Sequence, residues 1–256
     1  MNRALNFSKR NLLEISRDTL SYIFCIAFPI VMLIVMTLVN SSIPKEAGMT
    51  IFRIDNLMGG IIIFGQTFVM LFTAITIAKD RSGSFLIRLF ATPMKSSDFT
   101  YGYILPMILI AVVQALISSV AALIISLIVG VKLEIFGILL TLAAMLPSAF
   151  MFVAIGLIFG TLFNEKAAPG VCSIIISLGS FVGGIWFDAE GAGGVLYKIC
   201  RCLPFIYCTK TVRSAIKLDI SWESFWLPLI IVSASAAVLS GLGILCFRKR
   251  MKADLA

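Results

Sequence analysis

Six long stretches of the sequence lack any Lys, Arg, Asp or Glu, and charged residues flank each of them. Because about twenty apolar residues in a helix cross the hydrocarbon of a bilayer, each stretch predicts a transmembrane helix. The sequence therefore predicts an all-α integral membrane protein, with a single domain over residues 1–256. The six predicted spans cover residues 19–43, 56–78, 101–131, 135–164, 167–187 and 224–247.

Residues 1–18 have an amphipathic pattern of helical period, which predicts an N-terminal helix lying in the membrane interface. The alternative is a frayed charged tail. The stretch is too long and too polar for the charged start of a cleavable signal peptide, so the first span is expected to be retained. The apolar face carries Ala4, Leu5, Ser8, Leu12 and Ile15, and the polar face carries Arg3, Arg10, Glu14 and Arg17.

The polar segment 79–100, between the second and third spans, has an apolar centre. Four cations, Lys79, Arg81, Arg88 and Lys95, surround the apolar residues 85–87 and 89–91. A solvated loop has no need of such a centre, so a partner surface is expected to pack on this segment. The alternative is a helix that touches only the lipid surface.

Composition supports a membrane location, because 60% of the residues are hydrophobic and only 13% are charged, against about a quarter charged in ordinary domains. With both termini in the cytoplasm, 13 of the 21 cations lie inside, and five of the eight outer ones fall within residues 188–223. This distribution follows the positive-inside rule. The net charge of +8 then reflects orientation and contact with anionic lipid, and no nucleic-acid partner is expected.

The sequence excludes several kinds of chemistry. It has no histidine and no phosphate-binding motif of the G-x-x-x-x-G-K-[ST] type, so His-based catalysis, imidazole metal sites and an internal ATPase are all excluded. The spans also lack the charges that ion-coupled transporters use. These features disfavour a membrane-embedded enzyme and a stand-alone secondary transporter or channel. They favour a transporter that binds no cofactor itself and takes energy from another protein.

Polar residues inside the spans are mild. Gln66, Thr73 and Gln114 are candidates for a substrate path, although hydrogen bonding between helices is the more common role of such residues. Cys200, Cys202 and Cys208 cluster in the outer loop, where at most one pair could form a disulfide, and the sequence leaves this open.

The six-span layout, the amphipathic N-terminus and the sequence RLFATPM at residues 88–94 together resemble the ABC-2 type permeases. These are the membrane subunits of ATP-driven exporters. A second similarity lies in GGIWF at 183–187, LPFIY at 203–207 and VRSA at 212–215, which look like the family's outer segment between the last two spans.

The resemblance implies a function for each of these segments. Residues 79–100 would form a cytoplasmic coupling helix in a cleft of a separate ATP-binding cassette ATPase, which uses the ATP, and a second permease chain would complete the transporter. Residues 188–223 would form outer re-entrant helices, with Pro204, Phe205 and Arg213 as marker residues. The cargo would be a drug, an antimicrobial peptide, a lipid or a lipid-linked glycan, exported across the plasma membrane. The coupling interface would consist of Arg81, Phe85, Leu86, Arg88, Leu89, Phe90 and Pro93.

Overall fold

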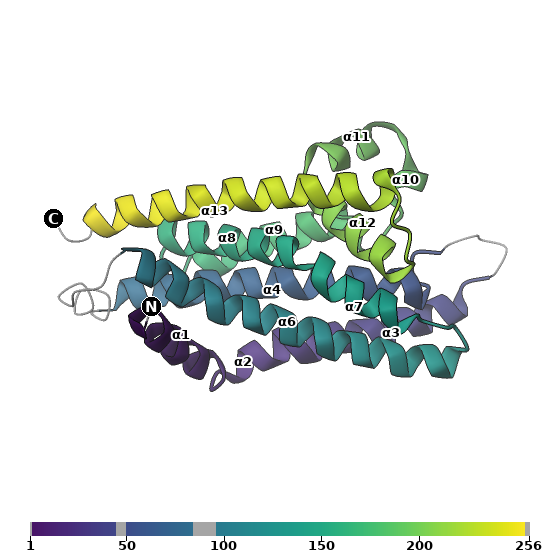
Figure 1. The fold of residues 1–256 in the computed structure, drawn as a ribbon, viewed down its shortest axis with the longest axis horizontal. Helices are drawn as coiled ribbons and strands as arrows, with labels where there is room; N and C mark the ends of the chain where they lie inside the picture. The colour runs from purple at the N-terminus through teal and green to yellow at the C-terminus, as the bar shows by residue number, and fades with distance from the viewer. Residues whose placement is uncertain (1, 45–49, 84–95, 254–256) are drawn as a thin grey trace.

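The computed structural model describes residues 2–44, 50–83 and 96–253, and this part of the chain contains helices and no strand. Figure 1 shows an elongated bundle in which the long helices run roughly side by side. Within these described ranges, five helices are long and apolar enough to cross a membrane: Thr19–Ser42, Ile54–Ser82, Asp98–Val129, Ile135–Leu162 and Trp222–Arg250. The prediction of a multi-span, all-helical protein is confirmed at this level.

The structure does not confirm the fifth predicted span, at residues 167–187, and therefore does not confirm a total of six spans. The helix there, α9 (Ala168–Val182), has 15 residues, and at about 1.5 Å per residue it falls short of the roughly 30 Å hydrocarbon core. The helix ends because Gly183 and Gly184 follow it, and Gly184 takes a left-handed φ of 63° that ends a helical run.

Proline marks the start of helical segments inside two spans. Pro29 lies in the first turn of α3 (Phe28–Ser42), and Pro147 in the first turn of α8 (Leu146–Leu162). A proline in the first turn gives up no hydrogen bond of its own helical segment, so each span continues through a change in its hydrogen-bond pattern. Before these changes lie α2 (Thr19–Tyr22), the π-helix η1 (Ile23–Ala27) and α7 (Ile135–Ala144).

The helix α4 (Ile54–Ser82) forms the centre of the bundle, since most of its residues are buried. It packs against α3, α8, α9 and α6 (Ser96–Val129). Two glycines of α8 lie close to the backbone of α4. A Cβ atom at Gly156 would lie 2.5 Å from the Met70 carbonyl oxygen, and one at Gly160 would lie 2.6 Å from that of Ala74. The spacing of small residues at 156 and 160 thus permits backbone contact between the two helices.

Short helices lie at the two ends of the bundle. The helix α1 (Asn2–Ile15) and the C-terminal end of α13 (Leu227–Ala253) lie toward one end, and α10, α11 and α12 lie toward the other (Figure 1). The remaining elements are α10 (Ala189–Ala192), α11 (Gly194–Cys202), α12 (Phe205–Ile216) and the π-helix η3 (Trp222–Trp226).

Candidate functional site

The helix α4 continues beyond the charge-free run and includes the first four residues of the polar segment 79–100. Its last turn places Asp80 inside the protein, where the residue is only 4% exposed. The sequence predicts that the span ends at Ala78 and places Asp80 in the polar segment that follows. The helix continues four residues past Ala78, and the second of these positions places Asp80 on the buried face.

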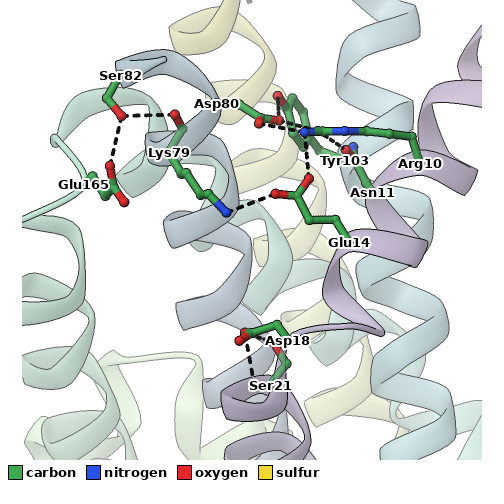
Figure 2. A network of polar contacts seen from close by, with 10 residues as sticks. All are labelled: Arg10, Asn11, Glu14, Asp18, Ser21, Lys79, Asp80, Ser82, Tyr103 and Glu165. Atoms are coloured by element: carbon green, nitrogen blue, oxygen red, sulfur yellow. Dashed lines mark hydrogen bonds and ion pairs between the residues drawn. The ribbon is translucent and has the colours of Figure 1, made fainter. Parts of the chain in front are cut away.

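Asp80 is held by residues from two other helices, as Figure 2 shows. Arg10 of α1 donates from both terminal guanidinium nitrogens, with Nη1 at 2.8 Å from Oδ2 and Nη2 at 3.2 Å from Oδ1. The hydroxyl of Tyr103, in α6, donates to the same Oδ2 at 2.8 Å. A buried carboxylate is stable only when it is paired and hydrogen-bonded. Asp80 therefore joins α1, α4 and α6 at one point.

Two further ion pairs extend this network along α1. Glu14 lies 2.6 Å from Arg10 Nη2 and 3.1 Å from Lys79 Nζ, so it bridges α1 to the last turn of α4 (Figure 2). Burial of the Arg10 guanidinium would lower its pKa, but the hydrogen bond and charge of Asp80 outweigh this effect and the pKa is raised. Arg10 therefore stays charged at any physiological pH.

Contacts with the first turns of α6 fix the position of α1. Asn11 is fully buried, and its Nδ2 donates to the Gly102 carbonyl oxygen at 3.0 Å. The ring of Phe7 covers Gly102, where a Cβ would come within 2.1 Å of it, and meets the Tyr103 ring edge-on at 5.0 Å. The absence of a side chain at Gly102 is thus what lets α1 lie against α6.

The buried face of α1 differs from the apolar face expected from the sequence. Ala4 and Ile15 are buried as expected, but Leu5 is half exposed, and the polar Asn11 is buried instead. The face of α1 that packs on the bundle is therefore rotated relative to the apolar face of the sequence pattern, whose contact with the membrane interface stays a prediction. The reason is that Asn11 and Arg10 find polar partners on α4 and α6.

The last residues of α4 also contact the end of α8. Arg81 donates from Nη1 to the carbonyl oxygens of Gly160, at 3.1 Å, and of Thr161. Basic side chains satisfy the free carbonyls at a helix C-terminus in this way. Ser82 donates to Glu165, just beyond α8, at 3.0 Å (Figure 2). The end of α4 is thus bound to three neighbouring helices.

Most of the residues predicted to dock the ATPase lie outside the described part of the chain. Of that set only Arg81 is described, and it contacts α8 rather than the outside of the bundle. The others are Phe85, Leu86, Arg88, Leu89, Phe90 and Pro93.

The three residues predicted for a substrate path are buried inside the bundle. Gln66 Nε2 donates to the Met145 carbonyl oxygen at 3.3 Å, and Ser148 donates to Gln66 Oε1 at 2.7 Å, at the break between α7 and α8. Thr73 donates to the Val69 carbonyl of its own helix.

Gln114 is arranged differently from Gln66. Its Nε2 donates to Ser118 at 3.1 Å, whereas its buried Oε1 has no hydrogen-bond partner within the described residues. The side chain lies against Gly65 of α4, where any Cβ would overlap it. Gln114 is thus the one member of the set with unused hydrogen-bonding capacity.

The three residues predicted to mark the outer segment lie together around α12. Pro204 is the N-cap of this helix, and Phe205 stacks on Phe152 of α8 with ring centroids 5.9 Å apart. Arg213 Nε donates to the Asn56 carbonyl oxygen at 3.0 Å, at the start of α4. The structure thus attaches α12 directly to the central helices. All six cysteines of the chain are free thiols.

Sequence reasoning missed Asp80, Tyr103 and Asn11 as site residues. One signal was present for Asp80, which follows the buried residues Thr73 and Ile77 at helical spacings of seven and three. The buried face of the span therefore predicts an inward position for residue 80. No comparable signal existed for Asn11 or Tyr103, because their partners lie far away in the sequence.

Comparison with known proteins agrees with this architecture. Residues 5–217 match the family model described as ABC-2 type transporter, which covers well over half of the chain. No curated protein matches the chain. Proteins of this family are the membrane-spanning permease components of transporters, and they generally work with an ATPase subunit and a partner permease. The similarity expected from residues 88–94 and the outer motifs is confirmed: this multi-pass membrane protein belongs to the ABC-2 type transporter family.

Proposed function

We propose that this chain is the permease subunit of an ATP-driven exporter and that residues 79–100 couple it to a separate ATP-binding cassette ATPase. Family membership supports the permease role. The observation that carries the coupling role is the pairing of Asp80 with Tyr103 and Arg10. These contacts tie together the two helices that enter and leave residues 84–95, and they place α1 across both.

The geometry suggests how the segment would act on the spans. A displacement of residues 84–95 would be transmitted to the end of α4 and the start of α6 together, because the Tyr103 hydroxyl is hydrogen-bonded to Asp80. Arg81 would pass the same displacement to α8. The bound ends of these helices would then move as one body. The docking surface itself would be the apolar residues Phe85, Leu86, Leu89 and Phe90, with Arg88 facing acidic groups of the ATPase and Pro93 ending the helix.

The proposed orientation has both termini in the cytoplasm of a cell whose plasma membrane holds the protein. The cation distribution along the sequence supports this orientation. The position of α1 and the end of α13 toward the same end of the bundle also fits it (Figure 1). In this orientation the Asp80 network lies on the cytoplasmic side, where an ATPase would bind.

The proposed cargo is hydrophobic or amphipathic, such as a drug, an antimicrobial peptide or a lipid, with lipid-linked glycan export as the alternative within the family. A path between these apolar spans would be lined mainly by apolar side chains, which supports a hydrophobic or amphipathic cargo. A second permease chain, identical or different, would complete the path. Gln114 is the best-supported polar contact on such a path because its buried Oε1 has no partner within the described residues. Gln66 and Thr73 remain weaker candidates, since their bonds lie within the bundle.

Purification of the tagged chain from its native membranes tests the proposal. We expect an ATP-binding subunit to co-purify, and ATP hydrolysis by that subunit to rise when the permease is present. The Phe90→Asp and Arg88→Glu variants should lose transport while the bundle stays folded. The matched control is Lys132→Glu, a charge reversal at an exposed position outside residues 79–100.

Two results would contradict the proposal. Transport by the purified chain alone, driven by an ion gradient, would indicate a secondary transporter or channel. Retention of the ATPase by Phe90→Asp and Arg88→Glu at the level of the unchanged protein would remove residues 79–100 as the docking segment.

A further inference from the structure

A second polar region lies at the end of the bundle away from Asp80. It is a cavity of about 200 Å³, partly open to the outside, between the start of α4, residues 183–189 and α12. Its charged lining residues are Lys210, Arg213 and Lys217 together with Asp188 and Asp219. No part of the proposed coupling role uses this cavity.

The three cations reach the cavity from one face of α12. Lys210, Arg213 and Lys217 are spaced by three and four residues, which places them above one another on a helix. Arg213 is partly buried, and its hydrogen bonds to the carbonyl oxygens of Asn56 and Ile185, at 3.0 and 3.4 Å, fix its guanidinium in place. These contacts with backbone oxygens hold the guanidinium in one orientation. The cavity is therefore lined by a cation whose position is fixed by hydrogen bonds to the backbone.

Among the described side chains, three cations and two carboxylates line the cavity, which leaves an excess of one positive charge. Asp55 lies 4.0 Å from Lys217, but Asp55 is also paired with Arg53 at 3.4 Å, so these two residues add no net charge. Hydrogen bonds from Ser221 and Ser224 lower the pKa of Asp219, so this carboxylate stays ionised at neutral pH. A ligand carrying one negative charge would balance the site.

The arrangement of these charges also selects among anions. A phosphodiester carries one negative charge and several acceptor oxygens, which suit a guanidinium and two ammonium groups. The carboxylates of Asp188 and Asp219 disfavour a more highly charged anion, and they attract an amino group. Both requirements are met by a phosphodiester that bears an ammonium group.

We infer that this cavity binds the headgroup of an amine-bearing phospholipid such as phosphatidylethanolamine. Lys210, Arg213 and Lys217 hold the phosphodiester, and Asp188 and Asp219 face the amine. The headgroup position matches the place of α12 at the end of the apolar spans, where lipid headgroups meet the protein. Such a lipid would hold α12, and through Arg213 the start of α4, in its place at this end of the bundle. The site is independent of the proposed docking of an ATPase.

Native mass spectrometry of the full chain in detergent, titrated with phosphatidylethanolamine, tests the inference. We expect the Lys210→Gln/Lys217→Gln double variant to bind this lipid at least about tenfold more weakly. Lys210→Arg/Lys217→Arg, which keeps both charges, should bind within about threefold of the unchanged protein. The matched control is Lys132→Gln, an exposed cation outside the lining of this cavity. Arg213 is left unchanged because it also bonds the backbone of α4.

Two further ligands, diacylglycerol and phosphatidylglycerol, show which part of the headgroup the protein binds. Diacylglycerol has the same chains without the phosphate and should bind weakly to every variant. Asp188→Asn should weaken phosphatidylethanolamine while leaving phosphatidylglycerol, which has no amine, unchanged or tighter.

Three results would overturn the inference. The first is equal binding of phosphatidylethanolamine by the Lys210→Gln/Lys217→Gln variant and the unchanged protein. The second is diacylglycerol binding as tight as that of phosphatidylethanolamine. The third is saturable binding of inorganic phosphate without saturable binding of phosphatidylethanolamine. This result would assign the cavity to a free anion.

Discussion

Arg10 and Asp80 are 70 positions apart in sequence, yet the Arg10 guanidinium donates hydrogen bonds to both carboxylate oxygens of Asp80, at 2.8 and 3.2 Å. The pair joins the N-terminal helix to the end of the central helix α4. Asp80 is nearly fully buried, whereas about a third of the Arg10 side chain is exposed. The carboxylate therefore depends on Arg10 and Tyr103 for its stability more than Arg10 depends on the carboxylate.

Asp80→Asn is expected to lower the free energy of unfolding in detergent by about 2–3 kcal/mol, because it removes charge-assisted hydrogen bonds at a buried position. Arg10→Gln should cost a similar amount by leaving a buried charge without its partner. Both changes remove the same ion pair. The double variant should therefore lose clearly less unfolding free energy than the sum of the two single losses. Chemical denaturation followed by circular dichroism measures all three.

Glu134→Gln is the matched control for this cycle, because Glu134 is exposed and makes no capping hydrogen bond at the start of α7. It should change stability by no more than about 0.5 kcal/mol. Additive effects of Asp80→Asn and Arg10→Gln would contradict the pairing.

Gly156→Ala and Gly160→Ala are expected to loosen the contact between α4 and α8. The new methyl groups would lie 2.5 and 2.6 Å from backbone oxygens of α4, so the helices must separate. We expect a loss of about 1–3 kcal/mol for each in thermal or chemical unfolding. Gly241→Ala in α13 is the control, since nothing lies within 4 Å of its Cβ position. That change should be neutral or stabilising by up to about 1 kcal/mol, and an equal loss at Gly241 would refute the packing argument.

The long apolar runs predict most of this fold because the cost of placing charge in hydrocarbon fixes where a span can begin and end. The structure does not confirm the fifth span that this reasoning predicts. Residues 167–187 are apolar throughout, but Gly183 and Gly184 end α9 after 15 residues. The apolar composition of a segment does not show at which glycine the backbone adopts a left-handed conformation.

The network around Asp80 could be predicted only in part. Helical spacing from Thr73 and Ile77 indicates that residue 80 faces inward. The choice of Arg10 and Tyr103 as partners depends on how α1 lies across α6, which in turn depends on the contact of Phe7 with Gly102. Contacts between residues so far apart leave no local pattern in a single sequence.

Gln66→Leu separates a structural role from a substrate contact. The amide of Gln66 bonds Met145 and Ser148 at the break between α7 and α8, so its removal should cost about 1–2 kcal/mol of stability. Gln114→Leu should cost less, because the change also removes a buried oxygen that has no partner within the described residues. If Gln114 contacts the cargo, this variant should reduce transport more than it reduces stability. A larger stability loss for Gln114→Leu than for Gln66→Leu would contradict this assignment.

Cysteine labelling tests the orientation of the chain. Cys202 is exposed on α11, whereas Cys208 is buried, and burial raises the pKa of its thiol, so it stays in the unreactive protonated form. In a variant with Cys202 as the only cysteine, a membrane-impermeant maleimide should label intact cells. In a cysteine-free background, Glu165→Cys, at the Asp80 end of the bundle, should be labelled only after the cells are permeabilised. Labelling of residue 165 in intact cells, with protection of Cys202, would place the Asp80 network outside the cell and leave no ATPase within its reach.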